Sequence, residues 1–204
     1  MVTSTLGWVE TPYLACPAGA AELRAGSRVE ARRLGCGTEL ALHFLPGVRT
    51  GVDVMRGEEV EVFGALDWLS TDSSLVVLPG THSKWIRCES GAIADFVTVP
   101  TGDLHAALHT STLLSRTLPD EPASLGVAAP REGALRRSFC LGVEMALDDG
   151  PLSTLFKVRA RAVLDGVSAE DSSAFLSGAL IAGELLERLP RAAAAMPGAP
   201  LVLG

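Results

Sequence analysis

The sequence contains few cysteines and no excess of positive charge. Its four cysteines in 204 residues are widely spaced and form no C-x-x-C pair: Cys16, Cys36, Cys88 and Cys140. This spacing argues against a disulfide framework or a zinc site, so we expect reduced thiols in a cytoplasmic protein. The formal net charge is -7. Nucleic acid is therefore not expected as the main partner, because phosphate backbones attract basic surfaces.

Long apolar runs and several familiar motifs are missing as well. No stretch approaches the roughly 20 apolar residues that a membrane span requires, so no membrane partner is expected. The sequence has no G-x-x-x-x-G-K and no G-x-S-x-G, which argues against a P-loop kinase and an α/β-hydrolase. With 48% hydrophobic and 20% charged residues, the composition is that of a globular enzyme with a buried core.

Hydrophobic periodicity predicts strands in the first half of the chain and mainly helices in the second. Strands are expected at 29–34, 39–45, 75–78, 84–88, 93–99 and near 201–203. Helices are expected at 54–69, 131–148, 152–164, 169–189 and from a cap at Thr101 to about 114, with Ser168 capping 169–189. Pro and Ala enrichment at 117–130 predicts a linker. We therefore expect an α/β protein with two lobes, 1–116 and 131–204.

A polar loop follows the apolar run at 75–78. It reads Gly80-Thr81-His82-Ser83-Lys84. Successive amide groups in such a turn form a concavity that binds anions, and glycine lets the backbone approach a phosphate closely. Lys84 could add a point charge. The alternative is a tight turn whose polar side chains simply face solvent.

An arginine lies beside a pair of carboxylates at Arg56, Glu58 and Glu59. A guanidinium can hold a substrate carboxylate through two hydrogen bonds, and a nearby glutamate can accept a hydroxyl proton during phosphoryl transfer. The alternative is structural, because acidic residues are favourable at the start of any helix. His105 and His109 are spaced to share a helix face, but no further ligand accompanies them and we expect no metal site there.

These motifs occur within a longer series of blocks that resembles the 2-dehydro-3-deoxygalactonokinase family. The series begins with Met1-Val2-x-Ser4-x-x-Gly7-Trp8-x-Glu10-x-Pro12-Tyr13 and includes Val54 to Glu59 and Leu78 to Trp85. It continues with Thr101-Gly102-Asp103-Leu104, Leu155-Phe156-x-Val158-Arg159-Ala160 and Phe175-Leu176-Ser177-Gly178. The blocks keep their order through nearly the whole chain.

The resemblance implies a kinase that transfers the γ-phosphoryl group of ATP to 2-dehydro-3-deoxy-D-galactonate, with Mg²⁺ as cofactor. It also implies the ribonuclease H-like, actin-like ATPase fold, with two α/β lobes. Gly80 to Lys84 would be the second phosphate-binding loop, and Ser4, Trp8 and Arg56 would lie on the sugar-acid side. Glu58 or Glu59 would be the catalytic base, with Glu58 favoured. Whether the protein is a homodimer is left open.

Some features depart from the family pattern. The family's first phosphate loop precedes the start of this chain, and its adenosine-binding segment should begin near 201–204, where the chain ends. Asp103 stands where the family usually has glutamate, and Ser111 where it usually has histidine. We therefore expect little ATP turnover from these 204 residues alone. The rival interpretation is a non-catalytic fragment or degenerate relative that binds a sugar acid or a partner protein.

Overall fold

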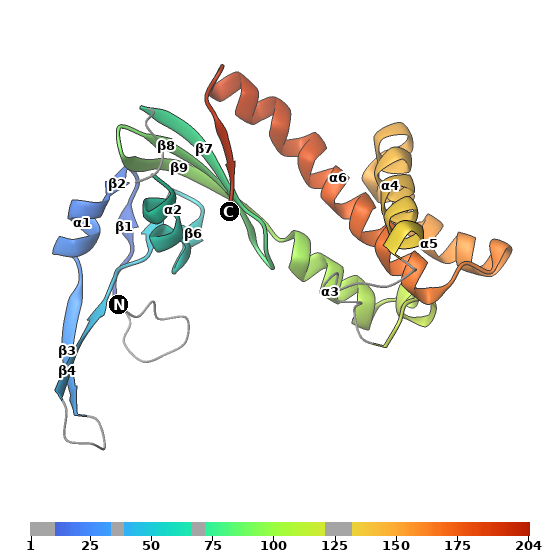
Figure 1. Cartoon of the computed structure of the whole chain (residues 1–204), viewed down its shortest axis with the longest axis horizontal. Helices are drawn as coiled ribbons and strands as arrows, with labels where there is room; N and C mark the ends of the chain where they lie inside the picture. The colour runs from blue at the N-terminus through green and yellow to red at the C-terminus, as the bar shows by residue number, and fades with distance from the viewer. Residues whose placement is uncertain (1–10, 34–38, 67–71, 121–131) are drawn as a thin grey trace. The chain divides into compact units, whose positions relative to one another are not determined.

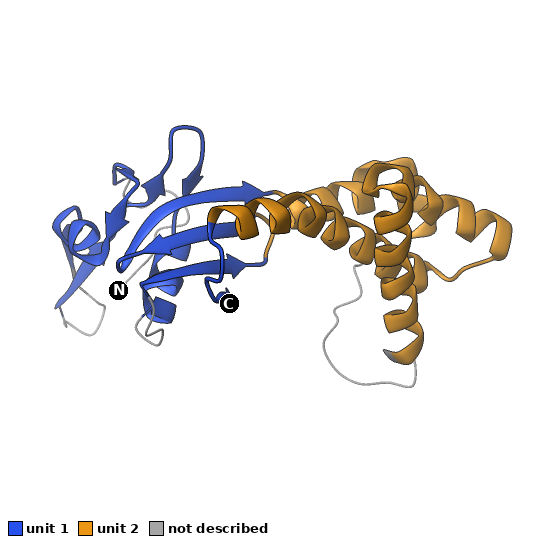
Figure 2. Ribbon diagram, turned by 90° about the horizontal axis from the view of Figure 1, so that it is seen from above, with its two compact units in different colours: residues 1–79, 83–99, 196–204 blue, residues 80–82, 100–195 orange. Residues whose placement is uncertain are grey.

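Residues 11–33, 39–66, 72–120 and 132–204 are described by a computed structural model (Figure 1). The chain forms two compact units (Figure 2): unit 1 holds residues 1–79, 83–99 and 196–204, and unit 2 holds 80–82 and 100–195. These bounds differ from the predicted lobes. The helix after residue 100 packs on the later helices, and residues 201–203 join the sheet of unit 1. Which part of an active site each lobe supplies stays a prediction.

A five-stranded sheet forms the centre of unit 1, in the order β10-β7-β8-β9-β2. Its strands are β10 (Leu201–Leu203), β7 (Ser73–Leu78), β8 (Ser83–Glu89), β9 (Ala92–Val99) and β2 (Ala18–Gly19). Strand β10 pairs in parallel with β7, and the other neighbours are antiparallel. The predicted strands and hairpin are confirmed. Ser90 and Gly91 form the hairpin turn with φ of 50° and 74°, as a tight two-residue turn requires.

Two smaller sheets hold the other strands found among the described residues of unit 1. Strands β1 (Leu14–Ala15), β5 (Val48–Arg49) and β6 (Val54–Met55) form one of them. The second is an antiparallel ribbon of β3 (Arg28–Arg33) and β4 (Glu39–Phe44), which confirms the predicted pair of strands. A short helix, α1 (Ala20–Ala25), comes directly before the ribbon in the chain and lies beside its base (Figure 1).

The predicted helix at 54–69 begins later than expected. Helix α2 spans Glu58–Leu66, and Val54–Met55 is strand β6, paired with β5. Gly57 has a φ of 113°, a left-handed conformation that interrupts any helix and that glycine adopts without steric cost. Residues 67–69 of the prediction lie outside the described residues. The core beneath α2 includes Val62, Met55 and Ile86, which are each at most 2% exposed.

Unit 2 is helical in the residues that the structure describes. Its helices are α3 (Thr101–Ser111), the 3₁₀ helix η1 (Leu113–Thr117), α4 (Glu132–Asp149), α5 (Pro151–Asp165) and α6 (Ala169–Ala195). The three long helices confirm the prediction, although α6 continues through Pro190 to Ala195. Ser168 accepts a hydrogen bond from the Asp171 amide at 3.2 Å, as expected of a cap. Leu114, Val158 and Phe175 are among the buried residues of its core.

The predicted cap at Thr101 is wrong. Pro100 occupies the N-cap position of α3 and makes no side-chain capping bond, while Thr101 is the first helical residue. The hydroxyl of Thr101 instead donates to the carboxylate of Glu184 on α6. The helix also ends earlier than residue 114, because Thr112 is extended, with φ −124° and ψ 175°. Among the described helices, none combines the length and the apolar character that crossing a membrane demands.

Candidate active site

In the turn before α2, the carboxylates of Glu58 and Glu59 accept hydrogen bonds from backbone amides of the same turn. The amide of Arg56 donates to Glu58 Oε2 at 3.0 Å, and the amide of Gly57 donates to Glu59 Oε2 at 2.7 Å. Both glutamates therefore hold the turn just before α2, and their negative charge is favourable at the start of the helix. The two acids therefore have the structural role at a helix start that was the alternative to a chemical role. A chemical role must rest on the other contacts of each carboxylate.

Glu58 contacts the end of the polar loop. Lys84, the second residue of β8, places its Nζ 3.6 Å from Glu58 Oε1. The lysine side chain is 6% exposed, whereas that of Glu58 is 30% exposed. One member of the predicted acidic pair therefore contacts the last residue of the predicted phosphate loop. The carboxylate of Glu58 keeps access to solvent while a buried ammonium group holds it in place.

Glu59 has a different environment. It is 1% exposed and belongs to the core side of α2. Burial raises the pKa of its carboxyl group, and hydrogen bonds from backbone amides, including that of Gly57, act in the opposite direction. A carboxyl group that does not reach the surface is poorly placed to accept a proton from a bound substrate. The geometry therefore favours Glu58 over Glu59 for proton transfer.

The guanidinium group of Arg56 is held by the segment before β1. It donates to the Thr11 carbonyl at 2.8 Å, to Thr11 Oγ1 at 3.1 Å and to the Tyr13 hydroxyl at 3.4 Å. Its carbon Cζ lies 4.4 Å from the centre of the Tyr13 ring. The predicted carboxylate clamp thus already uses three of its N–H groups within the protein. Ser4 and Trp8, predicted on the sugar-acid side, lie outside the described residues.

Asp53 is a structural anchor of this region that the sequence analysis missed. Its carboxylate accepts from the Thr98 amide at 2.6 Å and from the Thr98 hydroxyl at 2.7 Å. These bonds tie the turn between β5 and β6 to β9. A Thr-x-x-Asp turn just before Arg56 was the available signal, because Thr50 Oγ1 accepts from the Asp53 amide at 3.0 Å.

The polar loop differs in character along its length. Ser83 and Lys84 are buried, at 3% and 5% exposed, whereas Gly80, Thr81 and His82 are exposed. A Cβ added at Gly80 would meet no atom within 4 Å, so this backbone is open to the approach of a ligand. In unit 2, the Asp103 amide donates to the Thr81 carbonyl at 2.9 Å, and His82 Nε2 lies 3.8 Å from Asp103 Oδ2.

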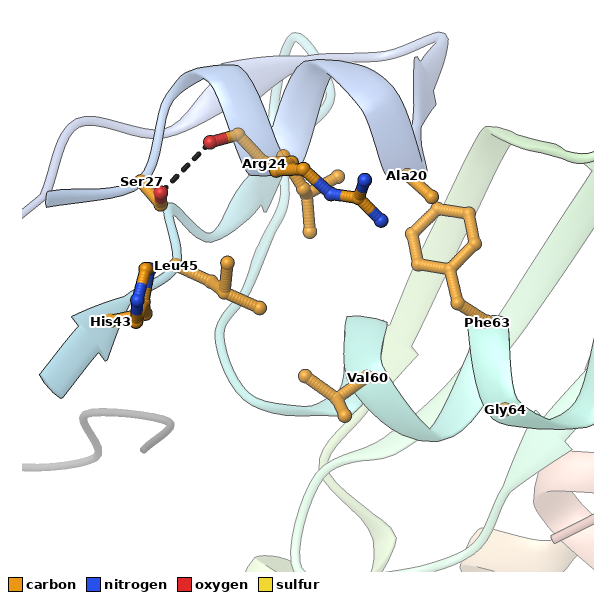
Figure 3. A pocket seen from close by; sticks show the side chains of 9 residues that line it. Ala20, Arg24, Ser27, His43, Leu45, Val60, Phe63 and Gly64 are labelled. Carbon is orange, nitrogen blue, oxygen red and sulfur yellow. Dashed lines mark hydrogen bonds between the residues drawn. The ribbon is translucent and has the colours of Figure 1, made fainter. Parts of the chain in front are cut away.

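Unit 1 also has an apolar pocket of about 410 Å³ (Figure 3). Phe63 and Val60 of α2 line it together with Leu45, and Arg24 and His43 supply polar groups. On a helix, positions 60 and 63 point away from position 58. Among the predicted site residues that the structure describes, none lines this pocket, and it is distinct from the Glu58–Lys84 pair.

The two histidines of α3 lie together as predicted, with ring centres 5.8 Å apart. His105 Nε2 is 3.3 Å from Ser177 Oγ on α6, and burial together with the neighbouring His109 lowers the pKa of His105. No cluster of three metal-ligating side chains occurs within the described part of the chain. Cys16, Cys88 and Cys140 are free thiols.

The structure therefore defines a mixed α/β protein of two compact units, with an acid–lysine pair at the end of a glycine-containing loop. A profile of the family described as 2-keto-3-deoxy-galactonokinase matches residues 1–203. The chain belongs to this family.

Individual relatives agree with the family match. The 2-dehydro-3-deoxygalactonokinase of Escherichia coli (strain K12) is 37% identical over 190 residues, covering 91% of this chain and 58% of the relative. A Rhizobium meliloti (strain 1021) protein named as a probable 2-dehydro-3-deoxygalactonokinase is 35% identical over 194 residues, with the same coverage. A crystal structure assigned to this enzyme from Sinorhizobium meliloti has a TM-score of 0.73 and 32% identity, and covers 97% of this chain and 62% of that one. The chain thus spans less than two thirds of the length of these relatives.

Proposed function

We propose that this chain is part of an ATP-dependent kinase that phosphorylates 2-dehydro-3-deoxy-D-galactonate in galactonate breakdown. The observation that supports it most directly is the contact between Glu58 and Lys84, which joins the predicted base to the predicted phosphate loop. The identity of the proposed substrate is inferred from the family match and from the names of the relatives. We further propose that the fold is of the actin-like ATPase type and that the protein works in the cytoplasm.

In the proposed reaction, Glu58 accepts the proton of the sugar-acid hydroxyl. The hydroxyl oxygen forms a bond to the γ-phosphorus of ATP, the bond from that phosphorus to the β,γ-bridging oxygen breaks, and ADP leaves. Lys84 orients the Glu58 carboxylate from its buried position, which is a change from the phosphate contact expected of it. Glu59 holds the turn before α2 through the Gly57 amide, and Gly80, Thr81, His82 and Ser83 form the phosphate loop.

Mg²⁺ fits the proposal as a partner of ATP. When bound, it neutralises phosphate charge. No described group of three ligating side chains would hold it, so the phosphate oxygens of ATP are its expected ligands. Arg56 is proposed to shape the sugar-acid side by fixing Thr11 and Tyr13. Those of its N–H groups that bond no described residue are proposed to contact the substrate carboxylate.

The test is a coupled assay of ADP release by the full-length gene product with a panel of keto-deoxy sugar acids. Glu58→Gln should reduce turnover by roughly 100-fold or more, the usual contribution of a general base. Glu59→Gln should keep most of it, and Glu61→Gln, an exposed change on the same helix, serves as the matched control. Loss confined to Glu59→Gln would refute the choice of base. Sugar-acid binding without ADP release would favour the non-catalytic rival.

A further inference from the structure

The first turn of α3 lies directly against the exposed part of the phosphate loop. A Cβ placed on Gly102 would be 2.6 Å from the Gly80 carbonyl oxygen, 2.7 Å from the Thr81 Cα and 3.1 Å from the Gly80 carbonyl carbon. All three atoms are backbone atoms, so they cannot move aside as the end of a flexible side chain would. The backbones of Gly102 and of Gly80–Thr81 are therefore in direct contact, and their separation leaves no room for a side chain at residue 102.

A hydrogen bond joins the same two segments. The Asp103 amide donates to the Thr81 carbonyl at 2.9 Å. Helix α3 has Pro100 at its N-cap and no side-chain capping bond, and the first amides of a helix lack partners inside it. The carbonyl of the loop thus takes the place of a capping side chain. This hydrogen bond therefore stabilises the loop and the start of the helix together.

The backbone conformation of Gly102 does not itself require glycine, because its φ is not in the left-handed range. Alanine is also the better helix former. What excludes a larger residue is therefore the distance to the loop. On the other side of the turn, the Thr101 hydroxyl donates to Glu184, which fixes the start of α3 on α6.

We propose that Gly102 is a positioning residue that sets the location of Gly80 and Thr81 for the phosphate groups of ATP. This inference rests on the proposed kinase function. With alanine at 102, the contact of 2.6 Å would have to open to at least the 3.4 Å of an ordinary contact. The loop backbone moves by this difference while Glu58, Lys84 and Arg56 keep their own contacts.

The experiment compares wild-type full-length protein with Gly102→Ala and with the control Gly133→Ala. Gly133 lies in α4, where a new Cβ would come no closer than 3.6 Å to Arg137. In Gly102→Ala we expect kcat/KM for ATP to fall by roughly 10- to 100-fold, since misplacements of about 1 Å have effects of this size. The KM for the sugar acid should change less than twofold, and Gly133→Ala should match the wild type.

Hydrogen exchange of the peptides covering residues 79–84 and 101–106 gives a readout that does not depend on activity. Exchange in both should rise in Gly102→Ala and not in Gly133→Ala. Should Gly102→Ala fail to fold, Thr101→Val replaces it, with the same pattern expected at a smaller size. Unchanged exchange, an unchanged KM for ATP and kcat, or an equal rise in both KM values would overturn the proposal. Inactive wild-type protein would instead refute the kinase function itself.

Discussion

Gly142 on α4 and Gly178 on α6 make reciprocal contacts where the two helices cross. A Cβ on Gly142 would lie 2.2 Å from the carbonyl oxygen of Phe175, and one on Gly178 would lie 2.1 Å from that of Phe139. Each glycine is three residues after the phenylalanine of its own helix. The crossing is therefore nearly symmetric, and it brings the two backbones into direct contact without intervening side chains.

From this contact we predict that Gly142→Ala destabilises the protein by a net value of about 1–2 kcal/mol. Forcing a methyl group against backbone atoms has a cost near the upper end of about 1–3 kcal/mol, from which a gain of roughly 1 kcal/mol in helix propensity is subtracted. Urea unfolding followed by circular dichroism measures the difference. Gly133→Ala in the same helix should be neutral or slightly stabilising. A stabilising effect at both positions would mean that the helices do not approach as described.

Because Glu58 and Lys84 form an ion pair in which the lysine is the more buried partner, we expect substitutions of the two residues to lower the free energy of unfolding by different amounts. Glu58→Gln leaves a buried ammonium group without its carboxylate and should cost about 1–3 kcal/mol, less than a fully buried pair because Glu58 is partly exposed. Lys84→Met removes the buried charge and should cost about 1 kcal/mol or less.

A double-mutant cycle provides the check on this pair. If the two residues interact, Glu58→Gln should cost less in the Lys84→Met background than in the wild type. Additive effects would show that the contact contributes nothing to stability. The same unfolding curves also separate a loss of base function in Glu58→Gln from a loss of folded protein in the kinase assay.

The lowered pKa of His105 predicts that acid weakens unit 2. The unfolded chain binds a proton near the ordinary value of 6.5, while the folded chain resists it because of burial and the neighbouring His109. Between that value and the lower folded value, the unfolded state carries more protons, so stability falls as the pH drops. Urea midpoints at pH 7.5 and 5.5 should differ less in His105→Gln than in the wild type. An equal difference in both proteins would refute the assignment.

Cysteine labelling should separate exposed from buried thiols. Burial raises the pKa of Cys16 and of Cys88 to about 11, so at pH 8 only about one in a thousand of these thiols is the reactive thiolate. Cys140 is exposed on α4. With iodoacetamide and peptide mass mapping, we expect Cys140 to be modified before Cys16 and Cys88, which should react only after addition of urea; Cys36 lies outside the described residues and is not part of this comparison. Equal rates in the folded protein would contradict the burial described.

Local patterns predicted most of the elements but not the contacts that define the site. The apolar run at 75–78 and the turn at Ser90-Gly91 led directly to β7, β8 and β9, because alternation and turn chemistry are local properties. The start of α2 was misplaced because Val54 continues the apolar pattern, whereas the φ of Gly57 decides the boundary. Apolar periodicity cannot reveal such a conformation.

Hydrogen bonds between residues that are far apart in the chain could not be predicted from the sequence. Arg56 binds Thr11 and Tyr13 across more than forty residues, and Thr101 bonds to Glu184 on another helix. From the sequence it was clear that these residues are polar, that Arg56 lies beside two carboxylates and that Thr101 lies at the start of a helix. Their partners could not be chosen in the same way, since hydrogen bonds between distant segments depend on how the whole chain packs.

The parallel pairing of β10 with β7 has a consequence for how the chain matures during synthesis. Strand β7 leaves the ribosome early, but its neighbour at 201–203 emerges only after the entire helical unit has been translated. Until then the amides and carbonyls along one side of β7 are unpaired, and open strands of this kind invite association with other chains. We therefore expect newly made protein to be open to association along β7 in this interval, and a chaperone that covers β7 would protect it until β10 pairs with it.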